Sequence, residues 1–146
     1  FAIHESTKKK LFDLFEKHIS EKIDPILSLK NGLKEILSKY ENDFEFRSTE
    51  MLFLKAEFNS LLKTDKELNK IFKEERNKTM NRLIDLVKRG QKLGSIRNDI
   101  TTENIVLSLI ANYIGFVTIW YLEIGEVDSK IDPENYIEIL LNGIRS

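Results

Sequence analysis

The fold of this chain is decided by the stretch Asn104-Ile-Val-Leu-Ser-Leu-Ile-Ala-Asn-Tyr-Ile-Gly-Phe-Val-Thr-Ile-Trp-Tyr-Leu122. It contains no Lys, Arg, Asp or Glu, although 32% of the residues in the whole chain are charged. When the stretch is drawn as a helix, large apolar side chains cover more than half of its circumference. The remaining arc carries small or weakly polar groups, namely Ser108, Ala111, Asn112, Gly115 and Thr118. A helix without a strongly polar face must be covered on every side. We therefore expect a central helix that is covered by its own domain, by a second subunit, or by both.

A membrane span is the alternative for the same stretch, because about 20 apolar residues are enough to cross a bilayer. The polar side chains of Ser108, Asn112 and Thr118 lie within it. The segments on either side are amphipathic, which is typical of helices at the surface of a soluble domain. We therefore predict a buried helix in a soluble protein, with no membrane partner.

The composition narrows the class of protein. A chain of 146 residues fits one domain with a sizeable core. It has 23 Lys and Arg against 24 Asp and Glu, a net charge of −1, whereas a surface that binds nucleic acid normally has a basic excess. The absence of cysteine excludes disulfides and thiolate chemistry and favours a cytoplasmic protein. Six glycines and two prolines are few, which favours long helices.

The N-terminal half shows apolar residues at helical spacing in three runs. The first predicted helix covers residues 7–24, because Ser6 and Thr7 offer an N-cap and Pro25 lacks the N–H that a helix interior needs. The second carries an apolar face that ends at Phe44. Ser48 and Thr49 are predicted to cap the third, which ends near residue 65 and has its apolar face at Met51, Leu54, Phe58, Leu61 and Leu62.

The C-terminal half contains the longest amphipathic run, from Lys66 to Leu93, followed by Gly94 as a left-handed C-cap. After the central stretch, Asp132 and Pro133 form a helix start, with aspartate at the N-cap and proline at the first helical position. The last predicted helix has only three turns, and its apolar face is wide for a helix of that length. No alternation typical of strands occurs, so the prediction is an all-α domain with about six helices.

Polar residues interrupt the apolar face of the long helix for one turn, at Glu75, Arg76 and Thr79. Either the helix turns these residues to the surface, or they line an internal cavity, where a buried arginine needs a partner such as Glu75 or an anionic ligand. Aromatic side chains that could form the walls of such a cavity, or simply pack in the core, are Tyr40, Phe44, Phe58, Phe72, Tyr113, Phe116 and Trp120.

The sequence contains no group of residues in a pattern typical of catalysis. His4 and His18 are the only histidines, and neither forms a metal-binding or nucleophile-activating pattern with the acidic residues. We therefore predict no catalytic residue, no metal site and no cofactor. An all-α enzyme stays the rival interpretation, and turnover of a defined substrate would revive it.

Four segments, taken in this order, resemble the tetracycline-repressor (TetR) family of bacterial transcriptional regulators. Residues 4–12 (HESTKKKLF) are similar to the family's junction between its recognition helix and the helix that follows. Residues 90–100 (GQKLGSIRNDI) are similar to the loop before its penultimate helix. Residues 112–116 (NYIGF) and 139–144 (ILLNGI) are similar to the glycine of that helix and to the closing segment. Glu5 departs from the pattern, because the family usually has an aromatic residue there.

The resemblance implies an effector-binding and dimerisation domain over residues 7–146, preceded in residues 1–6 by the remnant of a junction with an absent helix-turn-helix domain. It also implies a homodimer, a small, hydrophobic effector, and contact with operator DNA only through the missing domain. His4 and Lys8 occupy positions whose side chains contact DNA phosphates in the full-length family members. A helical protein-interaction module without a ligand is the alternative function.

The predicted effector site combines the aromatic side chains with Arg76 and Thr79 of the long helix and with the side-chain amide of Asn112 in the central helix. Arg76 is expected to select an anionic or strongly polar end of the effector, and Trp120 is expected to face the interior of its own subunit. The effector-binding residues are Tyr40, Phe44, Phe58, Phe72, Arg76, Thr79, Asn112, Tyr113, Phe116 and Trp120.

The predicted dimer is a four-helix bundle formed by residues 102–124 and 133–144 of each subunit. Gly115 costs about 1 kcal/mol relative to alanine inside a helix, so we interpret it as a point where a crossing helix approaches closely. The interface residues are Ser108, Ala111, Gly115, Thr118, Ile137, Leu140, Leu141 and Ile144.

Overall fold

The computed structural model describes residues 13–123 and 132–146, which are mostly helical. A short helical turn at residues 13–16 is followed by five helices, and the prediction of an all-α fold is confirmed. The five are α2 (Pro25–Asn42), α3 (Phe44–Leu62), α4 (Lys66–Leu93), α5 (Thr102–Glu123) and α6 (Pro133–Asn142). The one extended pairing in the described ranges is an isolated bridge between Ile96 and Arg145.

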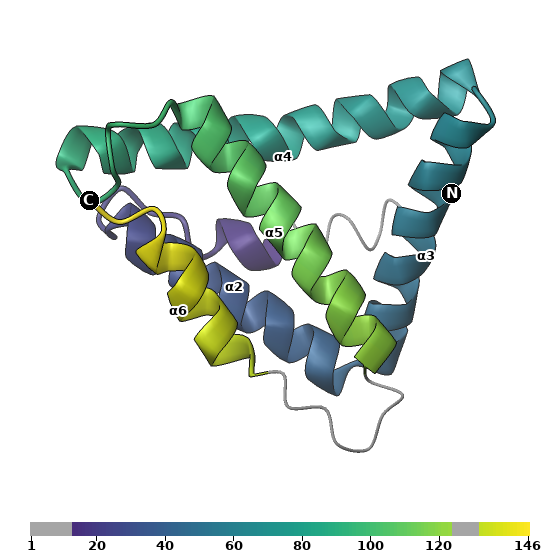
Figure 1. Ribbon diagram of the computed structural model, residues 1–146, viewed down its shortest axis with the longest axis horizontal. Coiled ribbons are helices and arrows are strands. Elements are labelled where there is room, and N and C mark those ends of the chain that lie inside the picture. Colours follow the sequence, from purple (N-terminus) through teal and green to yellow (C-terminus); the bar gives the residue numbers. More distant parts are fainter. Residues whose placement is uncertain (1–12, 124–131) are drawn as a thin grey trace.

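Helices α2, α3 and α4 form the three sides of a triangle, because each of them contacts the other two (Figure 1). Helix α5 starts beside the C-terminal end of α4 and runs diagonally across this triangle toward the corner between α2 and α3 (Figure 1). Helix α6 lies along α2. This arrangement brings the C-terminal ends of α2 and α5 and the starts of α3 and α6 to one corner of the domain (Figure 1).

Aspartates start four of the helices, because a carboxylate at the N-cap accepts a hydrogen bond from a free backbone N–H of the first turn. The N-caps are Asp24, Asp43, Asp65 and Asp132, and the predicted Asp132 start is confirmed. At the other end of α4, Gly94 has a φ of 85°, as the predicted left-handed C-cap requires.

The predicted cap at Ser48 and Thr49 is wrong. Asp43 caps α3 instead, with its Oδ1 2.9 Å from the backbone N of Phe46. The two hydroxyl residues therefore lie inside the helix, where the Thr49 hydroxyl donates to the carbonyl of Glu45 at 2.7 Å. An earlier start for α3 also moves Phe44 off the face of α2, so the predicted apolar face of the second helix ends before it.

The helix that was predicted over residues 7–24 ends earlier than expected. In its described part, the helix covers residues 13–16 and turns follow. The backbone N of Ile19 bonds to the carbonyl of Glu16, only three residues back, which tightens and ends the helix. Asp24 is used as the N-cap of α2, so it cannot continue a preceding helix. Residues 7–12 lie outside the described ranges.

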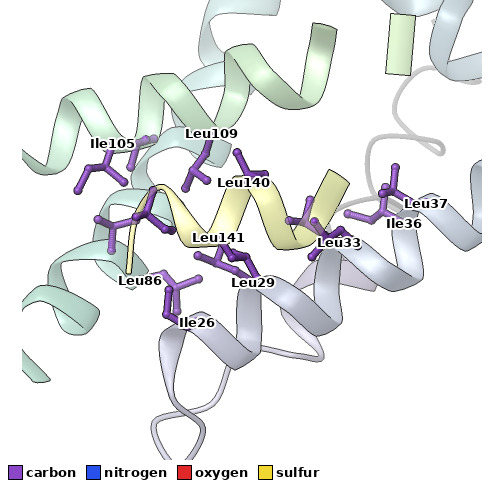
Figure 2. Close-up of a cluster of buried hydrophobic side chains, with 14 of the residues drawn as sticks. Ile26, Leu29, Leu33, Ile36, Leu37, Leu86, Ile105, Leu109, Leu140 and Leu141 are labelled. Atoms are coloured by element: carbon purple, nitrogen blue, oxygen red, sulfur yellow. The ribbon is translucent and has the colours of Figure 1, made fainter. Parts of the chain in front are cut away.

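The hydrophobic core lies between α2, α4, α5 and α6, with α6 between α2 and α5 (Figure 2). Its members follow the helical spacing of each element, so one face of each helix points inward. Figure 2 labels ten of the core residues, which are Ile26, Leu29, Leu33, Ile36, Leu37, Leu86, Ile105, Leu109, Leu140 and Leu141.

Helix α5 is covered on one side only. Its inner side contributes five buried residues to the core: Ile105, Val106, Leu109, Val117 and Trp120. On the outer side Leu107 is 53% exposed and Ile119 is 56% exposed, and Ser108 and Ala111 between them are also exposed. Of the three expected ways of covering this helix, cover by the chain's own domain on every side is therefore excluded for the described residues.

Candidate functional site

The corner where α2, α3, α5 and α6 meet contains a cluster of six aromatic side chains. Tyr40 comes from α2, Phe46 from α3, three residues from α5, and Tyr136 from α6. We refer to this set as the aromatic cluster, and its members are Tyr40, Phe46, Tyr113, Phe116, Trp120 and Tyr136. Four of the five helices with complete bounds therefore contribute to one group of rings.

The rings of the cluster are in direct contact. Phe116 and Tyr136 stack with centroids 3.8 Å apart and planes 9° from parallel. The Phe116 and Trp120 centroids are 5.5 Å apart, and those of Tyr40 and Trp120 are 6.5 Å apart. Phe46 meets Tyr40 edge to face at 5.4 Å, a geometry that aromatic pairs favour. The cluster thus links α2, α3, α5 and α6 through ring contacts.

Local sequence explains how these rings meet. Tyr113, Phe116 and Trp120 are spaced by three and four residues, so they lie on one face of α5. Tyr40 is in the last turn of α2, and the cap at Asp43 starts α3 only three residues later. That short connection places Phe46 next to Tyr40. The expectation that Trp120 faces the interior of its own subunit is confirmed, since Trp120 is buried.

Polar groups form a short chain on one side of the rings. The Tyr113 hydroxyl donates to the Tyr40 hydroxyl at 3.5 Å, and Tyr40 donates to Oε2 of Glu50 at 3.4 Å. Among the described residues, the buried hydroxyl of Tyr136 has no hydrogen-bond partner. Burial raises the pKa of Tyr40, Tyr113 and Tyr136 above the ordinary tyrosine value. All three hydroxyls are therefore neutral at physiological pH and able to donate a hydrogen bond.

The structure brings four of the ten predicted effector-binding residues together in the aromatic cluster: Tyr40, Tyr113, Phe116 and Trp120. Phe46, Glu50 and Tyr136 also belong to this corner and were not among the predicted residues. Tyr136 could have been found, because it is the aromatic residue nearest to the predicted start of the last helix. Phe46 and Glu50 could not, because their places depend on the cap at Asp43.

Four of the predicted residues point to solvent, so their assignment to the interior is wrong. Phe44 is 72% exposed and Phe58 is 55% exposed. Thr79 is exposed on α4, and Asn112 is exposed on α5 with its side chain bonded to the carbonyl of Ser108. The apolar face predicted for α3 is left largely uncovered, because α3 contacts α2 and α4 along its other sides. Phe72 is buried, but it is not part of the core cluster that contains the other rings.

Arg76 lies at the surface rather than in a cavity. Its Nε is 3.0 Å from Oε1 of Glu57 on α3, and its side chain is 45% exposed. Glu75, the partner suggested by the sequence, pairs with Lys78 instead. The polar interruption of α4 therefore turns to the surface, and the expectation that Arg76 selects an anionic effector loses its basis. A surface hollow of about 470 Å³ lies at the corner between α2 and α3, and it is lined by Glu35, Ser38, Lys39, Asn42, Asp43 and Phe44.

Half of the predicted dimer-interface residues are already buried within the chain. Ile137, Leu140, Leu141 and Ile144 are 9% exposed or less, because α6 packs this face against α2. Their assignment to an interface with a second subunit is therefore wrong. The opposite face of α6 carries Ile139, which is 75% exposed and was missed. On α5, Ser108 and Ala111 are exposed and Gly115 and Thr118 are half-buried.

Two further predictions concern sites that the described residues test only in part. His4 and Lys8, the predicted phosphate contacts, lie outside the described ranges. Within those ranges, no group of three or more His, Cys, Asp or Glu side chains is arranged to bind a metal ion. Residues Thr102–Trp120 have the length and composition of a membrane span. The inner side of the same helix, however, packs into the protein core.

Comparison with known proteins gives one informative match. No family model and no curated protein sequence matches this chain. Among solved structures, the ketosteroid transcriptional regulator KstR2 of Mycobacterium tuberculosis has the same fold, with a TM-score of 0.66 at 12% sequence identity. The superposition covers 96% of this chain and 68% of the KstR2 chain. KstR2 is a TetR-family regulator, so the predicted TetR-like fold is confirmed.

The unpartnered hydroxyl of Tyr136 makes a testable contribution to stability. Replacing Tyr136 by Phe removes a buried polar group that has no partner, so the free energy of unfolding should be unchanged or rise by about 1 kcal/mol. The matched variant Tyr113→Phe removes a bonded hydroxyl and should lower it by about 1 kcal/mol. Urea unfolding measures both. A larger loss for Tyr136→Phe than for Tyr113→Phe would contradict this description of the cluster.

Proposed function

We propose that this chain is the effector-binding and dimerisation domain of a TetR-like transcriptional regulator. The observation that carries the proposal is the aromatic cluster, which joins four helices of a TetR-like fold through ring contacts. A small molecule that enters between these rings changes the distances between the helices. A binding event at this corner therefore has a direct mechanical consequence for the whole domain.

The chemistry of the cluster favours a neutral, mainly apolar effector with a hydrogen-bonding group. Aromatic rings form its walls, and ligand pockets are mainly apolar with a few placed polar groups. The protons of Tyr113 and Tyr40 are already donated within the cluster, whereas the Tyr136 hydroxyl can donate to a ligand carbonyl or accept from a ligand hydroxyl. The buried Tyr136 hydroxyl would gain a partner on binding. Because KstR2 is described as a ketosteroid regulator, rigid ketones of similar size are the first compounds to screen.

The proposed regulation is a population shift and needs no chemistry on the effector. An effector with higher affinity for one arrangement of the helices increases the population of that arrangement. Two DNA-reading domains of a dimer must match half-sites about one helical turn apart, so a small change in their separation weakens operator binding. In this proposal the DNA readers are upstream of the chain, His4 and Lys8 contact phosphates, and the regulator works in the cytoplasm.

The proposed dimer is formed by the outer face of α5. Leu107, Ser108, Ala111 and Ile119 are exposed on this face, and a Cβ added at Gly115 would meet nothing within 4 Å in its own chain. A glycine inside a helix costs about 1 kcal/mol relative to alanine, and close approach of a second copy would explain it. Ile139 on the outer face of α6 adds apolar area. An obligate interface of this kind buries more than about 2,000 Å² in total.

The dimer prediction uses a charge placed on the outer face of α5. Ala111→Glu should dissociate the dimer, because it would bury an unpaired carboxylate at the interface. Leu62→Glu is the matched control, since Leu62 is 82% exposed on α3 and should not affect association. Sedimentation equilibrium measures both variants, and circular dichroism verifies that each is folded. Equal association of the two variants would show that α5 is not the interface.

The effector prediction uses Trp120, the only tryptophan of the chain. A compound that displaces Phe116, whose ring is 5.5 Å from Trp120, should change the indole fluorescence in a saturable way. It should also stabilise the fold by about 2.7 kcal/mol at a hundredfold excess over its dissociation constant, which thermal unfolding detects. Phe116→Ala should abolish both effects, whereas the control Phe58→Ala should leave them intact.

The alternative function, a helical interaction module without a ligand, is favoured by one observation. The rings of the cluster fill the corner by contacting each other, most closely in the stack of Phe116 on Tyr136. A screen of steroid ketones, acyl chains, aromatic compounds and cationic drugs separates the two functions. If no compound changes either the Trp120 fluorescence or the melting temperature, the effector proposal fails and the interaction module replaces it.

A further inference from the structure

The hydrogen bonds beside the aromatic rings end on a carboxylate of α3. The Tyr113 hydroxyl donates to the Tyr40 hydroxyl at 3.5 Å, and the Tyr40 hydroxyl donates to Oε2 of Glu50 at 3.4 Å. We name these three side chains the hydroxyl chain. Its members come from α5, α2 and α3, in that order. The hydroxyl chain therefore joins three helices at the same corner at which the rings meet.

Helix α3 holds Tyr40, the middle member, in position. Nη1 of Arg47 donates to the backbone carbonyl of Tyr40 at 2.9 Å. The ring of Phe46 meets the Tyr40 ring edge to face, with 5.4 Å between the centroids. Glu50 follows Phe46 by four residues, so both side chains lie on the same side of α3. Contacts from one helix thus hold the backbone, the ring and the hydroxyl of Tyr40, and the hydroxyl points to Glu50.

The chemistry of Glu50 sets the direction in which the protons are donated. An ionised carboxylate accepts hydrogen bonds and has no proton to donate. Tyr40 therefore uses its single proton on Glu50, and its oxygen accepts from Tyr113. Burial first, and then the negative charge of Glu50, raise the pKa of Tyr40, so its hydroxyl keeps this proton at neutral pH. Tyr113 has then donated its own proton, and its oxygen offers an effector only lone pairs.

We infer that Glu50 determines the polar group that an effector places against Tyr113, and that this group is a neutral hydroxyl. A carbonyl oxygen at that position would face the lone pairs of Tyr113 without a proton between them, and a buried acceptor without a donor is costly. An ammonium group is also a donor, but its burial among rings costs more than that of a hydroxyl unless it is paired. The inference rests on the proposed function, in which an effector enters between the rings. Glu50 acts through Tyr40 and is therefore a positioning residue.

The two polar ends of the aromatic cluster thus differ in what they accept. Among the described residues, the buried Tyr136 hydroxyl has no partner, so it can donate to a carbonyl or accept from a hydroxyl. Tyr113 can only accept. An apolar compound with a hydroxyl toward Tyr113 and a carbonyl toward Tyr136 satisfies both ends, whereas a diketone satisfies only one. The inferred effector class is therefore an apolar hydroxyketone or diol.

The first test examines the hydroxyl chain in the free protein. Glu50→Gln replaces the carboxylate by an amide of the same size that can donate to Tyr40. The four tyrosines are isotopically labelled at Cζ, and their magnetic resonance signals are assigned with Tyr→Phe variants. Donation to a carboxylate moves a Cζ signal toward the tyrosinate position. Glu50→Gln should therefore move the Tyr40 signal away from that position and also change the Tyr113 signal. The control Glu45→Gln, exposed on the same helix, should change neither.

The second test measures the preference for a hydroxyl in a Tyr136→Phe background, which lacks the hydroxyl that can bind either group. The probes are adamantanol and adamantanone, which differ only in the alcohol and ketone groups, and Trp120 fluorescence reports binding. The alcohol should bind about tenfold more tightly than the ketone, as expected for one buried hydrogen bond. Adding Glu50→Gln should abolish or invert this preference, whereas adding Glu45→Gln should preserve it. Adamantanamine, as its ammonium ion, should bind less tightly than the alcohol.

The outcomes separate this inference from the proposed function. An unchanged Tyr113 signal in Glu50→Gln, or equal changes in Glu45→Gln, overturns the assigned direction of the hydroxyl chain without any ligand. Equal binding of alcohol and ketone to Tyr136→Phe, or tighter binding of the ammonium ion, overturns the hydroxyl selection while the effector site stands. Binding of none of the three probes overturns the selection and the effector site together.

A second variant replaces Glu50→Gln if that variant does not fold. Tyr40→Phe removes the acceptor of the Tyr113 proton and leaves Glu50 in place. Tyr113 can then donate to a ligand carbonyl, so the preference for adamantanol in the Tyr136→Phe background should be lost here too. A preference that persists in Tyr40→Phe contradicts the inference, because the Tyr113 proton would then not be held by the hydroxyl chain.

Discussion

Helix α5 needs apolar cover on two sides, and the rest of the structure depends on this requirement. Its inner side contributes Ile105, Leu109 and Trp120 to the core, around which α2, α4 and α6 pack. Its outer side leaves Leu107 and Ile119 more than half exposed. Each 100 Å² of apolar surface removed from water contributes about 2.5 kcal/mol, so an uncovered helix face is a strong driving force for association. The proposed dimer follows from that imbalance.

Helix α2 contacts both the aromatic cluster and the residues that precede it. Its C-terminal turn carries Tyr40 in the aromatic cluster. One to two turns earlier, Glu35 pairs with Lys17 and His18, and Gly32 leaves room for the ring of Phe15. One helix thus carries both the proposed effector site and the contacts to the segment before α2.

Local chemistry made much of the fold predictable from the sequence, and long-range packing limited the rest. The start of α6 at Asp132 and the end of α4 at Gly94 depend on neighbouring residues only, and both predictions are confirmed. Periodicity places Tyr113, Phe116 and Trp120 on one face of α5. It cannot say whether the apolar face of α6 meets its own chain or a second copy, so Leu140 was assigned to the wrong surface. The prediction that Phe44 lies in the interior was wrong for a local reason, because Asp43, and not Ser48, caps α3.

The central claim is that the outer face of α5 is covered by a second copy of the chain. Multi-angle light scattering of the unmodified chain, eluted at micromolar concentration, tests this claim most directly. We predict a mass of about 34 kDa, twice the 17.1 kDa of one chain, that persists on tenfold dilution, as an interface of more than about 2,000 Å² requires. A mass near that of a single chain throughout would contradict the account, because α5 would then expose its apolar outer face to water.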